Sequence, residues 1–135
     1  MLTAALQPSP ALSHGFDGFI TFLRDPQAGA STLSPKRFSD VLSIDIQTLA
    51  AQAHVHRNTI HRAPASESVQ KFLREALRVL RAATDLCGDV GRAIFWYRNE
   101  PLPPFGYQTA EQLVTQGRTD DVLRYVESFE AGAAG

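Results

Sequence analysis

The stretch that decides the fold is residues 66–88, which read SESVQKFLREALRVLRAATDLCG. Apolar and small side chains recur every three or four residues, as expected for an α-helix with one buried face: Val69, Phe72, Leu73, Ala76, Leu77, Leu80, Ala83 and Thr84. The basic side chains fall mostly on the opposite face: Lys71, Arg74, Arg78 and Arg81. The pattern predicts a long amphipathic helix from Ser66 to about Leu86, with Gly88 as its C-cap.

Shorter helices are predicted on both sides of this segment, and no stretch alternates with the period of a strand. Upstream, the spacing predicts helices at 16–23, 35–42, 46–53 and 56–63, capped or stopped by these residues: Ser34, Asp45 and Pro64. Downstream, it predicts helices at 90–97, 110–116 and 119–131, capped by Asp89 and Thr109. The last of these should bury Val122, Leu123, Val126 and Phe129, and Pro101, Pro103 and Pro104 should form a stiff extended connection. The expected class is all-α.

Composition and charge bound the possible functions. The 135 residues contain no apolar run near the roughly 20 residues that cross a bilayer, and residues 1–13 carry no basic residue of the kind that opens a signal peptide. With a single cysteine, Cys87, no internal disulfide is possible, so we expect a cytoplasmic protein.

Residues 1–81 hold nine Lys/Arg against six Asp/Glu, whereas residues 82–135 hold four against eight. This asymmetry favours two surfaces with different partners, the basic one a candidate for nucleic acid.

Residues 49–62, LAAQAHVHRNTIHR, have the layout of a helix-turn-helix. Ala50 is small where the two helices would cross, and the wedge between them would be filled by Leu49, Ala53, Val55 and Ile60. Two positions depart from the usual pattern. His54 stands where a glycine normally adopts the left-handed conformation, and His56 stands where a serine or threonine normally caps the second helix. A purely structural hairpin would show the same apolar spacing.

The second of these helices, with its cap, carries the candidate DNA-binding residues: His56, Arg57, Asn58, Thr59, His61 and Arg62. Arg57, Asn58, His61 and Arg62 are expected on its outer face. Arginine and asparagine are suited to the edges of guanine and adenine in the major groove, while Thr59 is better placed to contact a phosphate or to pack. His56 and His61 are five residues apart and so lie on different helix faces, with no ligand spacing nearby. We therefore expect no metal site.

The second half carries a more specific pattern: AIFWYRNEPL at 93–102, FGYQTAE at 105–111 and LVTQGR at 113–118. Together with a final helix through Val122 and Phe129, this resembles the toxin-binding domain of the Xre/MbcA/ParS antitoxins. The resemblance covers about residues 34–132 and puts the helix-turn-helix where these antitoxins carry their Xre-like DNA-binding domain. Two departures are Ala110, where the family usually has proline, and the extra pair Pro103-Pro104.

The resemblance implies four regions. They are an N-terminal extension with a short helix (1–33), a helix-turn-helix domain (34–65), a connecting and dimerisation helix (66–88) and a small helical toxin-binding domain (89–135). It also implies two partners. The first is a RES-domain toxin that consumes NAD, whose active-site entrance such an antitoxin covers. The second is operator DNA, which such an antitoxin binds to repress its own operon.

The expected toxin-facing surface is the polar side of the final helix: Arg118, Asp120, Asp121, Tyr125, Glu127, Ser128, Glu130 and Gly132. A solvated helix face with a frayed tail is the alternative for these residues. The predicted helix at 66–86 carries more apolar positions than a helical hairpin alone can bury, and this favours a homodimer that covers the rest.

Other functions stay open beside this one. A stand-alone helix-turn-helix regulator or a helical adaptor that binds only protein would need the same elements. An enzyme is not expected, because Cys87 has no nearby histidine or aspartate in sequence and the glycines Gly15, Gly18 and Gly29 do not follow a strand as in a phosphate loop. No cofactor is predicted.

Overall fold

A computed structural model of the chain describes residues 15–25, 27, 29 and 31–134, and the exposure of side chains up to residue 130. Within these residues the chain forms eight α-helices, one 3₁₀ turn and no strand, which confirms the all-α class. The helices are α2 (Gly15–Leu23), α3 (Pro35–Leu42), α4 (Ile46–Gln52), α5 (Arg57–Arg62), α6 (Glu67–Cys87), α7 (Val90–Asn99), α8 (Ala110–Thr115) and α9 (Thr119–Ala134), and the 3₁₀ turn is η1 (Pro103–Phe105). Residues 1–14, 26, 28 and 30 of the predicted N-terminal extension lie outside the described residues.

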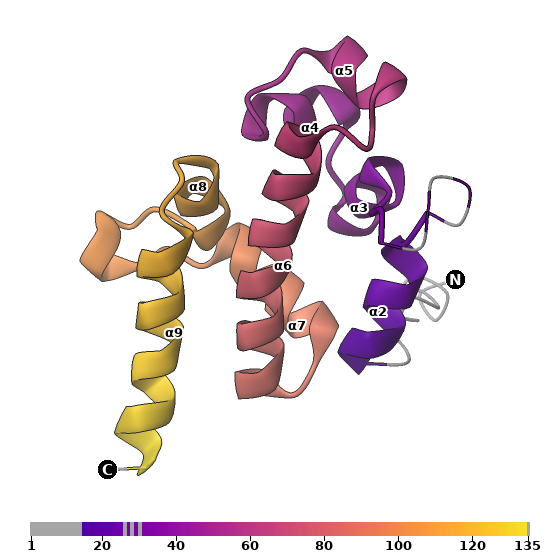
Figure 1. The fold of residues 1–135 in the computed structure, drawn as a ribbon. Coiled ribbons are helices and arrows are strands. Elements are labelled where there is room, and N and C mark those ends of the chain that lie inside the picture. The colour runs from indigo at the N-terminus through magenta and orange to yellow at the C-terminus, as the bar shows by residue number, and fades with distance from the viewer. Residues whose placement is uncertain (1–14, 26, 28, 30, 135) are drawn as a thin grey trace, which may run out of the picture.

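Helix α6, predicted as a long amphipathic helix, is the central element of the described fold. Helices α3, α7, α8 and α9 pack on it, and Figure 1 shows α9 along one side and α3 on the other. Because it is covered on more than one side, α6 buries residues outside the predicted stripe, including Val79 and Gln70. The apolar surplus that favoured a homodimer through this helix is thus covered by the chain itself.

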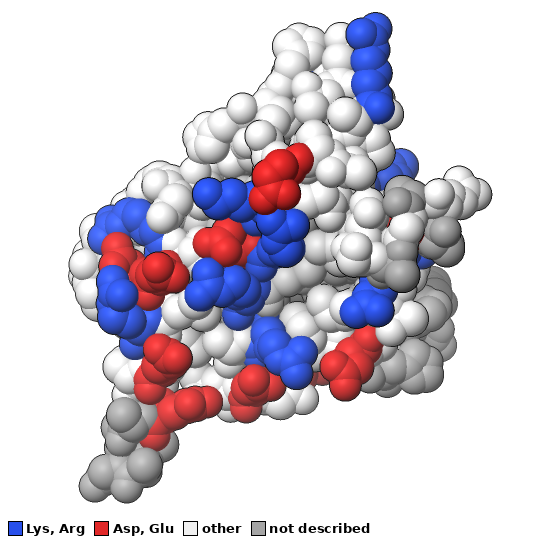
Figure 2. Space-filling model, in the orientation of Figure 1, with Lys and Arg blue, Asp and Glu red and all other residues white. Residues whose placement is uncertain are grey.

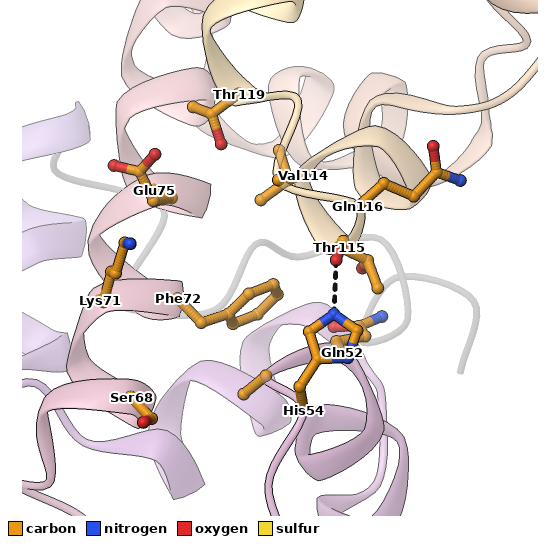
Figure 3. Close-up of a pocket in the computed structure, with 12 residues that line it drawn as sticks. Gln52, His54, Ser68, Lys71, Phe72, Glu75, Val114, Thr115, Gln116 and Thr119 are labelled. Atoms are coloured by element: carbon orange, nitrogen blue, oxygen red, sulfur yellow. Dashed lines mark hydrogen bonds between the residues drawn. The ribbon is translucent and has the colours of Figure 1, made fainter.

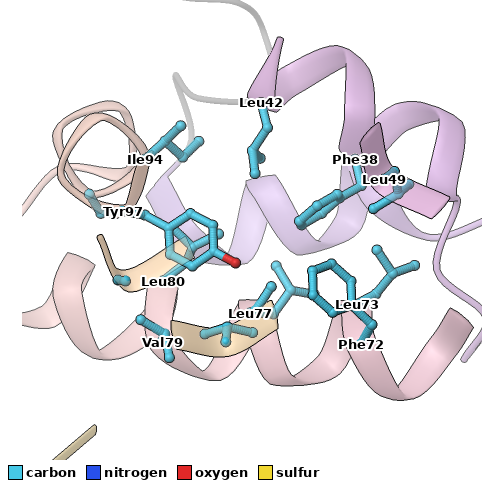
Figure 4. Packing of buried hydrophobic residues seen from close by; sticks show 14 of the residues in the cluster. Phe38, Leu42, Leu49, Phe72, Leu73, Leu77, Val79, Leu80, Ile94 and Tyr97 are labelled. Atoms are coloured by element: carbon cyan, nitrogen blue, oxygen red, sulfur yellow. The ribbon is translucent and has the colours of Figure 1, made fainter. Parts of the chain in front are cut away.

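One buried cluster runs through both halves of the chain. Figure 4 shows Phe38 and Leu42 of α3 and Leu49 of α4 beside Leu73, Leu77 and Leu80 of α6 and Ile94 and Tyr97 of α7. Polar contacts cross the same boundary, since the Arg98 guanidinium donates to the Leu42 carbonyl at 2.8 Å. A shared core therefore spans the predicted boundary between the N-terminal and C-terminal domains. The division into separate domains stays a prediction.

A buried glutamine holds both ends of the segment 34–65 against α6. The Gln70 amide nitrogen donates to the carbonyls of Leu33 at 2.9 Å and Pro64 at 2.8 Å, and its oxygen accepts from the Leu33 backbone N–H at 3.0 Å. Both amide protons and the oxygen are used, which offsets the cost of burying this polar group. Arg57 and the other α5 residues are thus carried by a segment that is anchored at its two ends.

Helix caps follow the local sequence. The side chains of Ser34, Asp45, Asp89 and Thr109 each accept a hydrogen bond from a backbone N–H in the first turn of their helix. These partners lie three residues away, so the bond needs nothing from the rest of the fold. Gly88 ends α6 with φ of 82°, in the left-handed region predicted for it.

Two expectations about the C-terminal half were wrong. The connection through Pro103 and Pro104 is not extended: it forms η1, and residues in the left-handed region then reverse the chain so that the Leu102 N–H donates to the Gln108 carbonyl at 2.9 Å. Phe129 is not buried but 49% exposed. The core ends at Val126, and α9 continues past the helices on which it packs.

None of the helices in the described part of the chain is long and apolar enough to cross a membrane.

Candidate nucleic-acid interface and partner surface

Helices α4 and α5 form the predicted helix-turn-helix, joined by residues 53–56. Leu49, Ala50 and Ile60 are buried between them at 0%, 3% and 5% exposure, and Val55 is half-buried. His54 has φ of 58°, so the left-handed turn forms without glycine. The His56 ring nitrogen Nδ1 accepts from the Asn58 N–H at 3.1 Å and caps α5 in place of a serine or threonine hydroxyl.

The His54 side chain connects the turn between α4 and α5 to α8. Its Nε2 lies 2.7 Å from the carbonyl oxygen of Thr115, the last residue of α8. Since a carbonyl can only accept, Nε2 carries the proton. This bond offsets a left-handed strain of order 1 kcal/mol. A second bond, from the Gln52 amide to the Glu111 carboxylate at 3.0 Å, ties the end of α4 to the same helix.

The predicted DNA-binding residues are brought together on one exposed surface. His56, Arg57, Asn58, His61 and Arg62 are all exposed, and Thr59 is half-buried, which fits packing better than base contact. Residues 46–65 contain no aspartate or glutamate, and neither arginine forms an ion pair with any described residue. In Figure 2 the tip formed by α4 and α5 shows blue side chains and no red ones. The tip therefore offers unneutralised cations to an anionic partner.

A concavity of about 430 Å³ lies between the two helices of the tip. It is lined by Gln47, Ala50, Ala51, Val55, His56, Arg57 and Asn58. Gln47, in the first turn of α4, was missed by the sequence analysis, although an exposed amide so close to a helix start was a visible signal. Glutamine, like asparagine, can pair with an adenine edge or donate to a phosphate. The surface thus combines amide and guanidinium donors from both helices.

A second cleft of about 430 Å³ lies where the tip meets the C-terminal helices (Figure 3). Phe72 and Val114 contribute apolar surface, while Lys71 and Glu75 of α6 and His54 of the α4–α5 turn contribute polar groups. Lys71 has no ion-pair partner among the described residues, whereas Glu75 is held by Arg78 at 3.1 Å. Because charges of both signs line the cleft, it has no evident preference for an anion or a cation.

The predicted toxin-facing residues do not form one patch. Each helical residue advances about 100° around the axis, so the polar residues of α9 fall on two flanks. Asp120 faces α6, where its carboxylate is 3.4 Å from the Arg78 guanidinium. Tyr125 faces η1, where its ring centroid is 5.7 Å from that of Phe105. Partner contacts to all of these residues would have to wrap around the helix.

Several of these residues are also occupied by neighbours in their own chain. The Arg118 guanidinium donates to the Asp121 carboxylate at 3.0 Å and lies over the Phe105 ring at 5.2 Å, and Arg124 also pairs with Asp121. The hydrogen bond from Arg118, with the charges of both arginines, lowers the pKa of the Asp121 carboxyl. The Ser128 hydroxyl donates to the Tyr125 carbonyl at 2.6 Å.

The remaining toxin-facing residues differ. Glu127 and Glu130 are exposed and unpaired among the described side chains, and Gly132 lies in α9 beyond the residues whose exposure is described. Two aromatic rings of α9 lie near these carboxylates in the chain. Phe129 stacks edge-on against Tyr125 with centroids 5.0 Å apart. Free carboxylates and half-exposed rings at this end are better placed for a partner than the paired residues near the start of α9.

No group of three or more His, Cys, Asp or Glu side chains in the described residues is arranged to hold a metal ion. No protein-family model, curated protein or solved structure matches the chain. The resemblance to the Xre/MbcA/ParS antitoxins therefore rests on the motif residues alone.

Proposed function

We propose that this chain is a cytoplasmic antitoxin that binds operator DNA through α5 and inhibits a RES-domain toxin through its C-terminal helices, without catalytic activity of its own. The observation that carries the DNA-binding part is the exposed, acid-free surface of α5, held at its N-terminus by the His56 cap and carrying two unpaired arginines. Arginine at such a position can both neutralise phosphates and read guanine.

The inhibitory part rests on the motif residues of 93–118 and on the charge of the second half. Residues 82–135 hold four Lys/Arg against eight Asp/Glu. An acidic surface is complementary to an enzyme pocket that binds NAD through basic residues. The antitoxin would cover that pocket and exclude NAD from it.

Co-expression tests the inhibitory part. The chain should rescue the growth of cells that express the RES-domain enzyme encoded beside it, and it should co-purify with that enzyme. Truncation after Phe129 should abolish rescue if the unpaired end of α9 makes the contact, because Glu130 and the residues after it are then missing. Rescue by the truncated chain would indicate that the toxin contacts lie within residues 89–125 instead.

A gel-shift titration with the chain's own promoter fragment tests the DNA-binding part. Promoter binding without a neighbouring toxin gene would favour a stand-alone regulator. Co-purification with a protein partner but no binding to any promoter fragment would favour a helical adaptor. The two halves of the proposal can therefore fail separately.

A further inference from the structure

Two hydrogen bonds connect the tip formed by α4 and α5 to α8. Figure 3 shows the first, from the His54 ring to the Thr115 carbonyl, beside the cleft of about 430 Å³ that separates the tip from the C-terminal helices. Thr115 is the last residue of α8, and carbonyls at the end of a helix lack an intrahelical partner and carry a partial negative charge. The His54 N–H therefore meets a strong acceptor on a helix of the C-terminal half.

The second bond belongs to a chain of polar contacts. The Gln52 amide at the end of α4 donates to the Glu111 carboxylate of α8. Arg98 of α7 pairs with the same carboxylate and also donates to the carbonyl of Leu42, the last residue of α3. The Glu111 side chain is only 11% exposed, so its position is fixed by the surrounding helices. The ends of α3 and α4 are thus both tied to α7 and α8.

Helix α5 has few contacts of its own that fix its direction. It spans six residues, its buried residue is Ile60, and it packs on α4. A helix this short is not stable alone, so its direction depends on what holds it. His54 lies two residues before the His56 cap, at the joint between α4 and α5. The direction of α5 is therefore set at a joint that α8 holds.

We propose that α8 is part of the DNA-binding site, and that His54 and Gln52 are positioning residues that hold α5 at the angle at which it binds DNA. This inference rests on the proposed DNA binding through α5. Neither bond uses a side chain of α5, so Arg57 and Arg62 stay free. A helix that is held in its binding orientation beforehand loses less freedom on binding, which raises affinity. The DNA-binding unit then extends beyond the predicted domain 34–65 into the C-terminal half.

A gel-shift titration of the full chain with its own promoter fragment tests the two bonds. His54→Gly combined with Gln52→Leu removes both donors and leaves every α5 side chain in place. Operator affinity should fall by about tenfold, the order expected for the loss of one to two hydrogen bonds. The matched control is Gln116→Ala, since Gln116 lines the same cleft but bonds to Gln108 and not to the tip. Wild-type affinity in the double variant, or an equal loss in the control, overturns the proposal.

The salt dependence of binding separates positioning from loss of folded structure. The slope of log affinity against log salt should be the same in the double variant as in the wild type, because the phosphate contacts of α5 are kept. Arg57→Ala should reduce this slope by about one. The urea midpoint of His54→Gly should stay close to that of the wild type. A reduced slope in the double variant would show that the bonds only keep α5 folded, and this overturns the proposal.

Hydrogen exchange without DNA measures the hold of α8 on the tip directly. In the double variant the backbone amides of α5 should exchange about fivefold faster or more, while those of α6 keep their rate, because only the tip opens locally. Unchanged exchange in α5 overturns the proposal. Failure of the wild-type chain to bind the promoter fragment would overturn the proposed function. Wild-type binding that the double variant retains in full would overturn only this inference.

Discussion

Two surfaces were predicted from the sequence to bind partners: the tip formed by α4 and α5, and the polar side of α9. They differ in whether their charged side chains form ion pairs within the chain. Arg57 and Arg62 form no ion pair with any described residue, while Arg118, Asp120 and Asp121 all form ion pairs within the chain. A charge on the outer face of a helix is therefore not by itself an available charge. Availability depends on the charges carried by the same helix and by the helices packed against it.

The largest expected effect is at the tip. Replacing both Arg57 and Arg62 by alanine should weaken operator binding by roughly 1–3 kcal/mol for each arginine that makes a bidentate base contact. The helical spectrum should stay unchanged, since both side chains are exposed. The matched control is Arg74→Ala with Arg78→Ala, which removes two exposed arginines that are already ion-paired. Equal loss in both double variants, measured by gel shift, would contradict the contrast between free and paired arginines.

The next effect is on the junction between the two regions. Arg98 holds the Glu111 carboxylate, whose side chain is only 11% exposed, with N–O distances of 3.3–3.4 Å, and it also donates to the Leu42 carbonyl. Arg98→Ala should lower the free energy of unfolding by about 2–3 kcal/mol, because it leaves a nearly buried charge without its partner. Urea denaturation measures this. Combining it with Glu111→Gln should recover part of the loss, and a further loss in the double variant would count against the pairing.

A smaller effect is expected at the turn of the tip. His54→Ala should lower the free energy of unfolding by about 1 kcal/mol, because it removes the bond to Thr115 and keeps a side chain in the left-handed region. His54→Gly loses the same bond but relieves the backbone strain, so its stability should lie close to that of the wild type. Thermal denaturation of the two variants separates these contributions. Glycine that destabilises as much as alanine would argue against a strained turn.

The smallest effect concerns the pH dependence of stability on the α9 side. The Arg118 hydrogen bond lowers the pKa of Asp121 in the folded protein. The ionised Asp121 therefore contributes to the free energy of unfolding above the ordinary aspartate pKa, and this contribution is lost as the pH falls through the lowered pKa of the folded protein. Below about pH 4 the wild type should therefore lose stability more steeply than Asp121→Asn. Parallel curves from urea denaturation between neutral and acidic pH would show that this surface pair contributes nothing measurable.

Residues whose role depends on near neighbours were predicted correctly. Asp45 and Thr109 cap their helices because the bond that defines the role closes within three residues. His56 caps α5 for the same reason, since its ring nitrogen accepts from the Asn58 N–H two residues away. Errors arose where a role depends on residues beyond the next helical turn. Pro103 and Pro104 bend into a tight turn because Leu102 pairs with Gln108, and Phe129 is exposed because the helices that would cover it end earlier.

By itself, then, the sequence determined the helices, their caps and the cluster of exposed basic and amide side chains on α5, since these depend on periodicity and on bonds between residues a few positions apart. Only the tertiary structure decided which charges are free, how Gln70 anchors both ends of the segment 34–65, and where apolar surface remains uncovered. Burial, and ion pairs such as Arg78–Asp120, join residues that are tens of positions apart. Their partners are set by how the helices pack, and the spacing of residues along the chain does not show that.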